Sequence, residues 1–130
     1  MKTVLLVDAD SGSFSTEEVM QRHGFKRIVA SNAREALAII RSDRTIDLIV
    51  TEMQFPDMDG LHFLTAVRAI APLLPIIVVT GSSSIENYLL AVNFGVHEYL
   101  SKPVLPTELI RIASIALGVP RHASLMRDAS

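Results

Sequence analysis

Five short segments rich in valine, isoleucine and leucine recur along the chain, with helix-length segments between them. They cover residues 3–7, 27–30, 46–51, 76–80 and 98–101. Three of them are nearly continuous in apolar residues instead of alternating with polar ones, which is typical of strands covered on both faces of a parallel sheet. We therefore expect an α/β fold in which five buried strands alternate with helices.

The segments between the strands carry start and stop signals for five helices. The first helix is expected to begin near Ser15, which has capping-box spacing to Glu18, and to end at Gly24. The other four are expected to begin at Asn32, at Asp59, after the cluster 81–84 and at Pro106, and the last three of them to end before Pro72, Gly95 and Gly118. Right-handed crossovers turn this (βα)5 pattern into a doubly wound sheet with helices on both faces.

The composition describes one globular domain without cysteine chemistry. The 130 residues include 12 basic and 14 acidic side chains and no cysteine, which excludes disulfides, thiolate nucleophiles and cysteine-bound metals. A net charge of −2 without a basic run predicts neither a nucleic-acid partner nor binding to an anionic membrane. No apolar segment is long enough for a signal peptide or a membrane span, so we expect a cytoplasmic protein. We assign residues 1–119 to the domain and 120–130 to a C-terminal tail or linker.

Polar residues concentrate where the predicted strands end. They are Asp8 and Asp10 after the first strand, Glu52 after the third, Thr80 at the end of the fourth and Lys102 after the fifth. Because doubly wound sheets bind ligands at the carboxyl ends of their strands, we expect these side chains to converge. Carboxylates suit a hard cation, while a hydroxyl and an ammonium suit phosphoryl oxygens. The sequence therefore predicts a small patch made for a phosphoryl group and a divalent cation.

Four ordered segments carry a resemblance to a known family. They are residues 4–10 (VLLVDAD), 47–60 (DLIVTEMQFPDMDG), 75–81 (PIIVVTG) and 99–103 (YLSKP). Together they resemble the receiver domain of two-component response regulators, over about residues 2–118. The resemblance implies a flavodoxin-like fold with strand order 2-1-3-4-5. It also implies that a histidine kinase donates a phosphoryl group to an aspartate after the third strand, with Mg²⁺ held by that aspartate and an acidic pair after the first strand.

The same resemblance suggests roles for residues on the last two strands. Thr80 and Lys102 correspond to residues that contact the phosphoryl oxygens. Tyr99 corresponds to an aromatic residue that changes rotamer with the signalling state. Pro103, directly after Lys102, is a candidate for a cis peptide bond.

Two departures from the family pattern fall on the chemistry itself. Glu52 stands where the family has its phosphoacceptor aspartate, and Ala9 stands where it has the second acid of the pair. The additional methylene of glutamate moves the carboxylate by about 1 Å, and a misplacement of this size can cost ~100-fold in rate. Only Asp8 and Asp10 then remain after the first strand to hold Mg²⁺, so we expect weak or absent Mg²⁺ and no other cofactor. We predict a pseudo-receiver that is not an enzyme and signals without the usual phosphorylation.

Two alternatives stay open at this point. One is a working receiver in which Glu52 is phosphorylated slowly, with Mg²⁺ bound through Asp8 and Asp10. The other is a small flavodoxin-like ligand-binding or enzyme domain that uses the same crevice. The role of Glu52 is open as well, because it can be a structural partner of Lys102 or can imitate a phosphorylated aspartate. Asp57 and Asp59 fit turn and cap chemistry better than phosphoryl transfer.

The expected partners are signalling proteins, namely a histidine kinase, a phosphotransfer protein or an effector protein. Ile110 and Ile115 flank the predicted apolar stripe of the last helix and are expected to widen it into a contact surface. With the fourth helix and the fifth strand, this surface resembles the face that receivers use for partners or for a homodimer.

Overall fold

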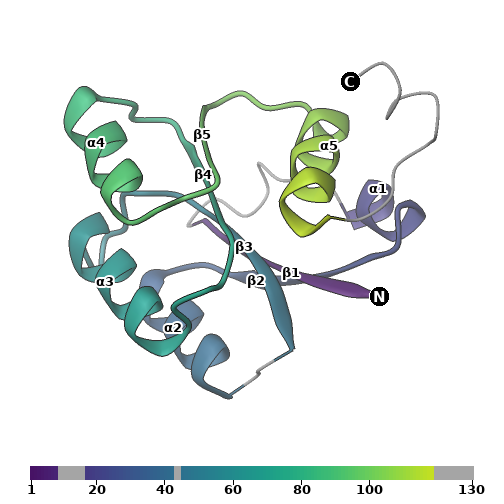
Figure 1. The fold of residues 1–130 in the computed structure, drawn as a ribbon, viewed down its shortest axis with the longest axis horizontal. Helices are drawn as coiled ribbons and strands as arrows, with labels where there is room; N and C mark the ends of the chain where they lie inside the picture. The colour runs from purple at the N-terminus through teal and green to yellow at the C-terminus, as the bar shows by residue number, and fades with distance from the viewer. Residues whose placement is uncertain (9–16, 43–44, 119–130) are drawn as a thin grey trace.

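The strands form a single parallel sheet in the order β2-β1-β3-β4-β5 (Figure 1). The computed structural model describes residues 1–8, 17–42 and 45–118. The strands are β1 (Lys2–Val7), β2 (Phe25–Ala30), β3 (Ile46–Thr51), β4 (Ile76–Thr80) and β5 (Glu98–Ser101). The predicted fold class and strand order are confirmed, and β2 begins slightly earlier than expected because Phe25 is also buried in the core.

Among the described residues, four helices connect the strands and a fifth follows β5, and together they cover both faces of the sheet (Figure 1). They are α1 (Glu17–Arg22), α2 (Ala33–Ser42), α3 (Gly60–Ile70), α4 (Ile85–Asn93) and α5 (Pro106–Leu117). Figure 1 shows α2, α3 and α4 on one side of the sheet and α1 and α5 on the other. The expected start of the first helix at Ser15, the domain boundary at residue 119 and the tail 120–130 all lie outside the described residues. Within the described part of the chain, no helix is long and apolar enough to cross a membrane.

Helix ends follow the sequence signals. Asn32, Asp59 and Ser84 each accept a hydrogen bond from the backbone amide three residues further on, at 2.8, 2.8 and 3.1 Å. Pro106 occupies the first turn of α5, where its missing N–H costs nothing. Gly118 ends α5 with φ 64°, a left-handed conformation that glycine adopts without a steric penalty. These local signals fix where the loops at the carboxyl edge of the sheet begin and end.

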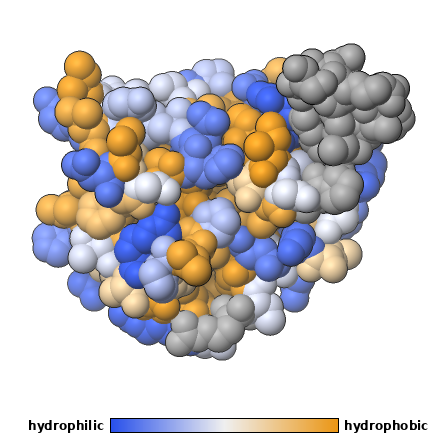
Figure 2. Space-filling view, viewed as in Figure 1, coloured by the Kyte–Doolittle hydropathy of each residue, from blue (hydrophilic) through white to orange (hydrophobic). Residues whose placement is uncertain are grey.

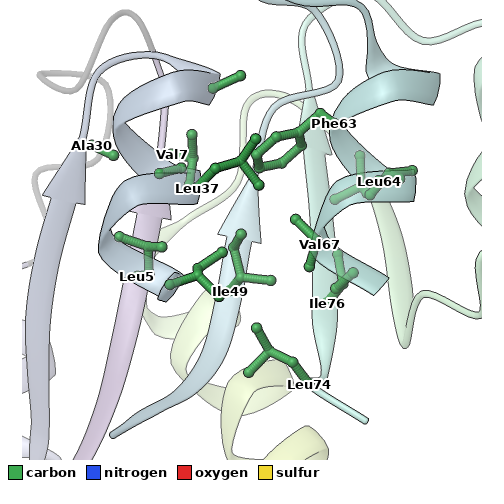
Figure 3. Packing of buried hydrophobic residues seen from close by; sticks show 14 of the residues in the cluster. Leu5, Val7, Ala30, Leu37, Ile49, Phe63, Leu64, Val67, Leu74 and Ile76 are labelled. Carbon is green, nitrogen blue, oxygen red and sulfur yellow. The ribbon is translucent and has the colours of Figure 1, made fainter. Parts of the chain in front are cut away.

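The core consists of two clusters, one on each face of the sheet. Successive strand residues point to opposite faces, so β1 sends Leu5 toward α2 and α3 and Leu6 toward α1 and α5. Figure 3 shows the first cluster, in which Ile49 of β3 lies among side chains of α2 and α3 such as Leu37 and Val67. Because both faces are covered, β4 is buried along its whole length.

One predicted contact residue belongs instead to this core. Ile110 is only 4% exposed and packs in the cluster beneath α5, whereas Ile115 is 48% exposed. The prediction that Ile110 helps to form a contact surface is therefore wrong. The buried side of α5 is wider than a single stripe, because Leu109 and Ile110 both face the sheet together with Ile112 and Ala113.

Arg68 anchors the end of α4 to α3. Its guanidinium donates to the carbonyl oxygens of Phe94, Gly95 and Leu74 at 2.8, 3.2 and 2.6 Å. These carbonyls follow α4 or precede β4, so one side chain satisfies acceptors from two connections. The carboxyl-terminal end of α4 is thereby held in place, away from the carboxyl edge of the sheet.

Candidate functional site

The polar residues singled out in the sequence meet at the carboxyl edge of the sheet. Asp8 follows β1, Glu52 follows β3, Thr80 is the last residue of β4, and Lys102 follows β5. Asp8, Glu52 and Thr80 are buried. Ala9 and Asp10 lie outside the described residues, so the structure describes one of the three acidic-pocket positions expected after the first strand.

Glu52 is surrounded by hydrogen-bond donors. Its Oε1 accepts from the backbone N–H of Met53 at 2.7 Å, and its Oε2 accepts from the backbone N–H of Gly81 at 3.2 Å. The Thr80 hydroxyl hydrogen-bonds to the same carboxylate, and the Lys102 Nζ lies 3.3 Å from Oε2. We call these four donors the anion site. They converge from the ends of β3, β4 and β5 on a single carboxylate.

The anion site keeps Glu52 ionised. Burial alone raises the pKa of Glu52 because it penalises the charged form. Hydrogen bonds from Thr80, Met53 and Gly81 and the charge of Lys102 outweigh burial, so the pKa of Glu52 falls below its usual 4.5. Glu52 is a carboxylate at neutral pH, and the site presents a fixed negative charge.

Lys102 pairs with two carboxylates at once. Its Nζ lies 2.5 Å from Asp8 Oδ2 and 3.3 Å from Glu52 Oε2. Burial lowers the pKa of Lys102, but the hydrogen bonds and charges of Asp8 and Glu52 outweigh it and raise the pKa above its usual 10.5. Lys102 therefore carries its positive charge at neutral pH.

The described residues do not fit a magnesium site. Mg²⁺ requires octahedral oxygen ligands, usually one or two carboxylates with several waters. Both oxygens of Glu52 already accept backbone N–H groups, and the Oδ2 of Asp8 holds the Lys102 ammonium. Among the described residues, no group of three or more potential ligand side chains could hold a metal ion. Asp10, the second predicted metal ligand, lies outside them.

Comparison with known proteins places this chain in a family. The family described as "Response regulator receiver domain" matches residues 4–114, which is most of the chain. The chain belongs to the receiver-domain family of response regulators. Receiver domains interact with histidine kinases and effector domains, and they are signalling modules rather than enzymes in the general sense. This assignment replaces the alternative of an unrelated small ligand-binding or enzyme domain.

Relatives of this receiver domain include much longer proteins. The chain is 30% identical over 102 residues to the transcriptional regulatory protein ZraR of Escherichia coli O157:H7, which covers 78% of this chain and 23% of that protein. It is 28% identical to the transcriptional regulatory protein GlrR of E. coli K12 with the same coverage. The chain thus spans about a quarter of the length of these curated relatives.

Solved structures of receiver domains match nearly the whole chain. The response regulator receiver domain protein (CheY-like) of Methanospirillum hungatei JF-1 superposes with a TM-score of 0.85 at 31% identity, over 91% of this chain and 94% of that one. The chemotaxis protein CheY4 of Vibrio cholerae gives 0.78 at 30% identity, over 90% and 99%.

Tyr99 of this receiver points into the structure. The residue is half-buried and packs against the cluster shared by α2 and α3. Its hydroxyl oxygen is buried without a hydrogen-bond partner among the described residues. Its ring meets the ring of Tyr88 edge-on, with centroids 5.5 Å apart. Tyr99 on β5 thus touches α4 directly, which links the strand next to the anion site to an outer helix.

The bond between Lys102 and Pro103 is cis, as the resemblance predicted.

Asp57 has a structural role that the sequence did not reveal. Its carboxylate accepts from the backbone amides of Ala33 and Arg34 at 3.2 and 3.0 Å, so it joins the loop after β3 to the start of α2. Asp59 caps α3, as its sequence context predicted.

The structure adds two groups that sequence analysis missed. They are the backbone amides of Met53 and Gly81, which complete the anion site. Every residue other than proline carries an N–H group, so no residue type signals such a donor. The only available signal was position, since both amides directly follow residues that had been singled out.

An apolar stripe covers the outer side of α4. Its members are Ile85, Tyr88, Leu89 and Val92, which lie at helical spacing and are each at least half exposed. Figure 2 shows hydrophobic side chains gathered over α4 at the upper left of the molecule. We call these four residues the α4 stripe. The exposed apolar surface predicted around α4 is present, while the α5 contribution is reduced to Ile115.

Proposed function

We propose that the protein is a cytoplasmic pseudo-receiver, which signals through protein contacts while the Glu52 carboxylate takes the place of a phosphoryl group. The observation that carries this proposal is the convergence of four donors on Glu52. By resemblance, Thr80 and Lys102 are the residues that would contact phosphoryl oxygens. Here they contact the oxygens of a side chain that is permanently part of the protein.

The same contacts make Glu52 a poor phosphoryl acceptor. A carboxylate that attacks phosphorus donates an oxygen lone pair, and the N–H groups and the ammonium around Glu52 withdraw electron density from both oxygens and so make them weaker nucleophiles. A phosphoryl group on Glu52 would also need the four donors that its carboxylate occupies. The longer side chain would carry that group beyond the anion site instead of into it, and geometry of this kind controls rate steeply.

The position of Tyr99 connects the strand beside the anion site to α4. Its ring is turned inward and its hydroxyl is buried, and the ring contacts Tyr88 of the α4 stripe. Thr80, one strand away in the sheet, is engaged with Glu52. We infer that the filled anion site, Tyr99 and α4 form one connected arrangement that partners read at the α4 stripe. The partners are signalling proteins such as a kinase, a phosphotransfer protein or an effector, or else a second copy through α4, β5 and α5.

Intact mass after incubation with Mg²⁺ and a small acyl-phosphate donor tests the absence of phosphorylation. The Ala9→Asp/Glu52→Asp variant, which restores the family pattern, is the positive control. We expect the variant to gain one phosphoryl group and the wild type to gain none. A phosphorylated wild type would overturn the proposal in favour of a slow receiver, and peptide mapping would identify the modified carboxylate.

Chemical rescue tests whether Glu52 acts as the resident anion. In Glu52→Ala the four donors lose the Glu52 carboxylate, and Lys102 keeps only Asp8, so NMR signals of the Tyr99 ring should move away from their wild-type positions. Added inorganic phosphate or sulfate should bind the emptied anion site and move them back. The wild type, whose site is filled, is the matched control and should not respond to either anion. If Glu52→Ala keeps the wild-type Tyr99 signals without any anion, Glu52 does not set the position of Tyr99, and the proposed role of Glu52 as the resident anion is wrong.

A further inference from the structure

Lys102 joins residues from strands that are not neighbours in the sheet. It follows β5, while Asp8 follows β1, and β4 and β3 lie between these strands. Its Nζ contacts the carboxylates of both Asp8 and Glu52. The side chain of Lys102 is 25% exposed and the two carboxylates are more buried still. One ammonium group therefore neutralises charge in a region where water contributes little screening.

Charge balance distinguishes this pocket from the family pattern. Asp8 and Glu52 carry two negative charges and Lys102 carries one positive charge, which leaves one net negative charge among the described residues. With a second acid at position 9, as in the family, the same pocket would carry two net negative charges, matching a divalent cation. Position 9 is alanine, so the described residues alone do not supply that match.

The ammonium also contacts the carboxylate oxygens that a metal ion would need as ligands. Lys102 Nζ lies at hydrogen-bond distance from Asp8 Oδ2 and in ion-pair contact with Glu52 Oε2. A divalent cation bridging these two carboxylates would have to displace the ammonium and shed part of its own hydration shell. Mg²⁺ loses water reluctantly. Oxygens that are already bonded to an ammonium or to N–H groups bind it too weakly to offset the free energy of that dehydration.

We propose that the Lys102 ammonium is the resident cation of this pocket, standing where a divalent metal would otherwise bridge Asp8 and Glu52. The pocket then keeps its arrangement without Mg²⁺. This inference rests on the proposed function, because it treats Glu52 as the fixed anion of the site.

A Mn²⁺ titration of the full chain tests this proposal, read as paramagnetic broadening of the backbone amide signals of Asp8 and Glu52. The wild type should show no selective broadening. Lys102→Met keeps a long side chain but removes the charge. This variant should bind Mn²⁺ at Asp8 and Glu52 at least about tenfold more tightly than the wild type, because the two carboxylates have lost their shared cation. Lys102→Arg retains the charge and should behave like the wild type. Lys102→Met/Asp8→Asn should lose the acquired site.

Selective broadening in the wild type, at Mn²⁺ concentrations similar to those that act on Lys102→Met, would overturn the inference. So would a folded Lys102→Met variant that gains no binding, with folding checked by circular dichroism. If Lys102→Met does not fold, the wild-type titration decides alone, since broadening at Asp8 and Glu52 contradicts the inference and its absence supports it. The mass experiment remains separate, because a phosphorylated wild type overturns the proposed function, whereas metal binding by the unphosphorylated wild type overturns only this inference.

Discussion

Helices α4 and α5 have similar apolar content and use it in opposite ways. α5 turns four apolar side chains toward the sheet, and all four are buried: Leu109, Ile110, Ile112 and Ala113. α4 buries only Ala91 and leaves the α4 stripe exposed, with Ile85 at 74% and Leu89 at 54%. An amphipathic helix normally buries its apolar side against the core. The apolar residues of α5 therefore stabilise the fold, whereas most of those of α4 are exposed and available for contact with another protein.

The position of each helix explains this difference. α5 lies over the sheet and contacts β3 and α1, whereas α4 packs chiefly against α3 (Figure 1). Arg68 holds the carboxyl-terminal end of α4 through backbone carbonyls, so few side chains of α4 are needed to keep it in place. Its amino-terminal end follows Thr80 and Gly81, which belong to the anion site. A helix that is fixed at one end and adjoins the site at the other is suited to present a surface that depends on the state of the site.

Replacing Ile110 by lysine should produce the largest effect on stability. Ile110→Lys puts a charge into a cluster without a partner and removes apolar packing, so we expect a loss of about 3–5 kcal/mol in the free energy of unfolding, or failure to fold. Urea denaturation followed by circular dichroism measures this loss. Ile115→Lys on the same helix is the matched control and should stay within about 0.5 kcal/mol of the wild type. Equal losses in both variants would mean that α5 is not oriented as described.

Removing the Arg68 guanidinium should have an intermediate effect. Arg68→Ala leaves the carbonyls of Phe94, Gly95 and Leu74 without their donor, which should cost about 2–3 kcal/mol of unfolding free energy. Amide hydrogen exchange should increase mainly in α4, because the anchor of that helix is lost. Arg68→Lys should recover less than half of the stability, since one ammonium cannot reproduce the planar set of donors. An even increase of exchange over all helices would show that Arg68 does not act on α4 in particular.

The fold was predictable because its signals are local and repeated. Continuous apolar strands, caps at Asn32 and Asp59, and glycine after the last helix each depend on a few neighbouring residues, and they all agree. The arrangement of α5 was predicted less well. Ile110 lies beside the expected stripe in the helical pattern, yet it is buried in the same cluster as Leu109 and Ile112. Periodicity gives the apolar side of a helix but not the width of its contact.

The candidate site was predictable in its residue types and not in its bonding. The order of strands brings Asp8, Glu52, Thr80 and Lys102 together, since each follows or ends a strand at the same edge. Whether Glu52 reaches the donors or stays apart from them depends on side-chain rotamers, which are set by packing over long sequence distances. The backbone amides of Met53 and Gly81 decide that question, and their orientation follows from the loops after β3 and β4.

Substitution within the α4 stripe should have the smallest effect on stability and so gives the sharpest test of the contrast between the two helices. Leu89→Lys/Val92→Lys exchanges two side chains that are more than half exposed, so each should change the unfolding free energy by no more than about 0.5 kcal/mol. The Tyr99 ring signals should also keep their wild-type positions, because Tyr88 is unchanged. Urea denaturation and NMR on the same sample measure both, and sedimentation velocity of wild type and variant shows whether the stripe serves self-association. A loss above about 2 kcal/mol would mean that the stripe is part of the core after all, and α4 would then be a structural helix like α5.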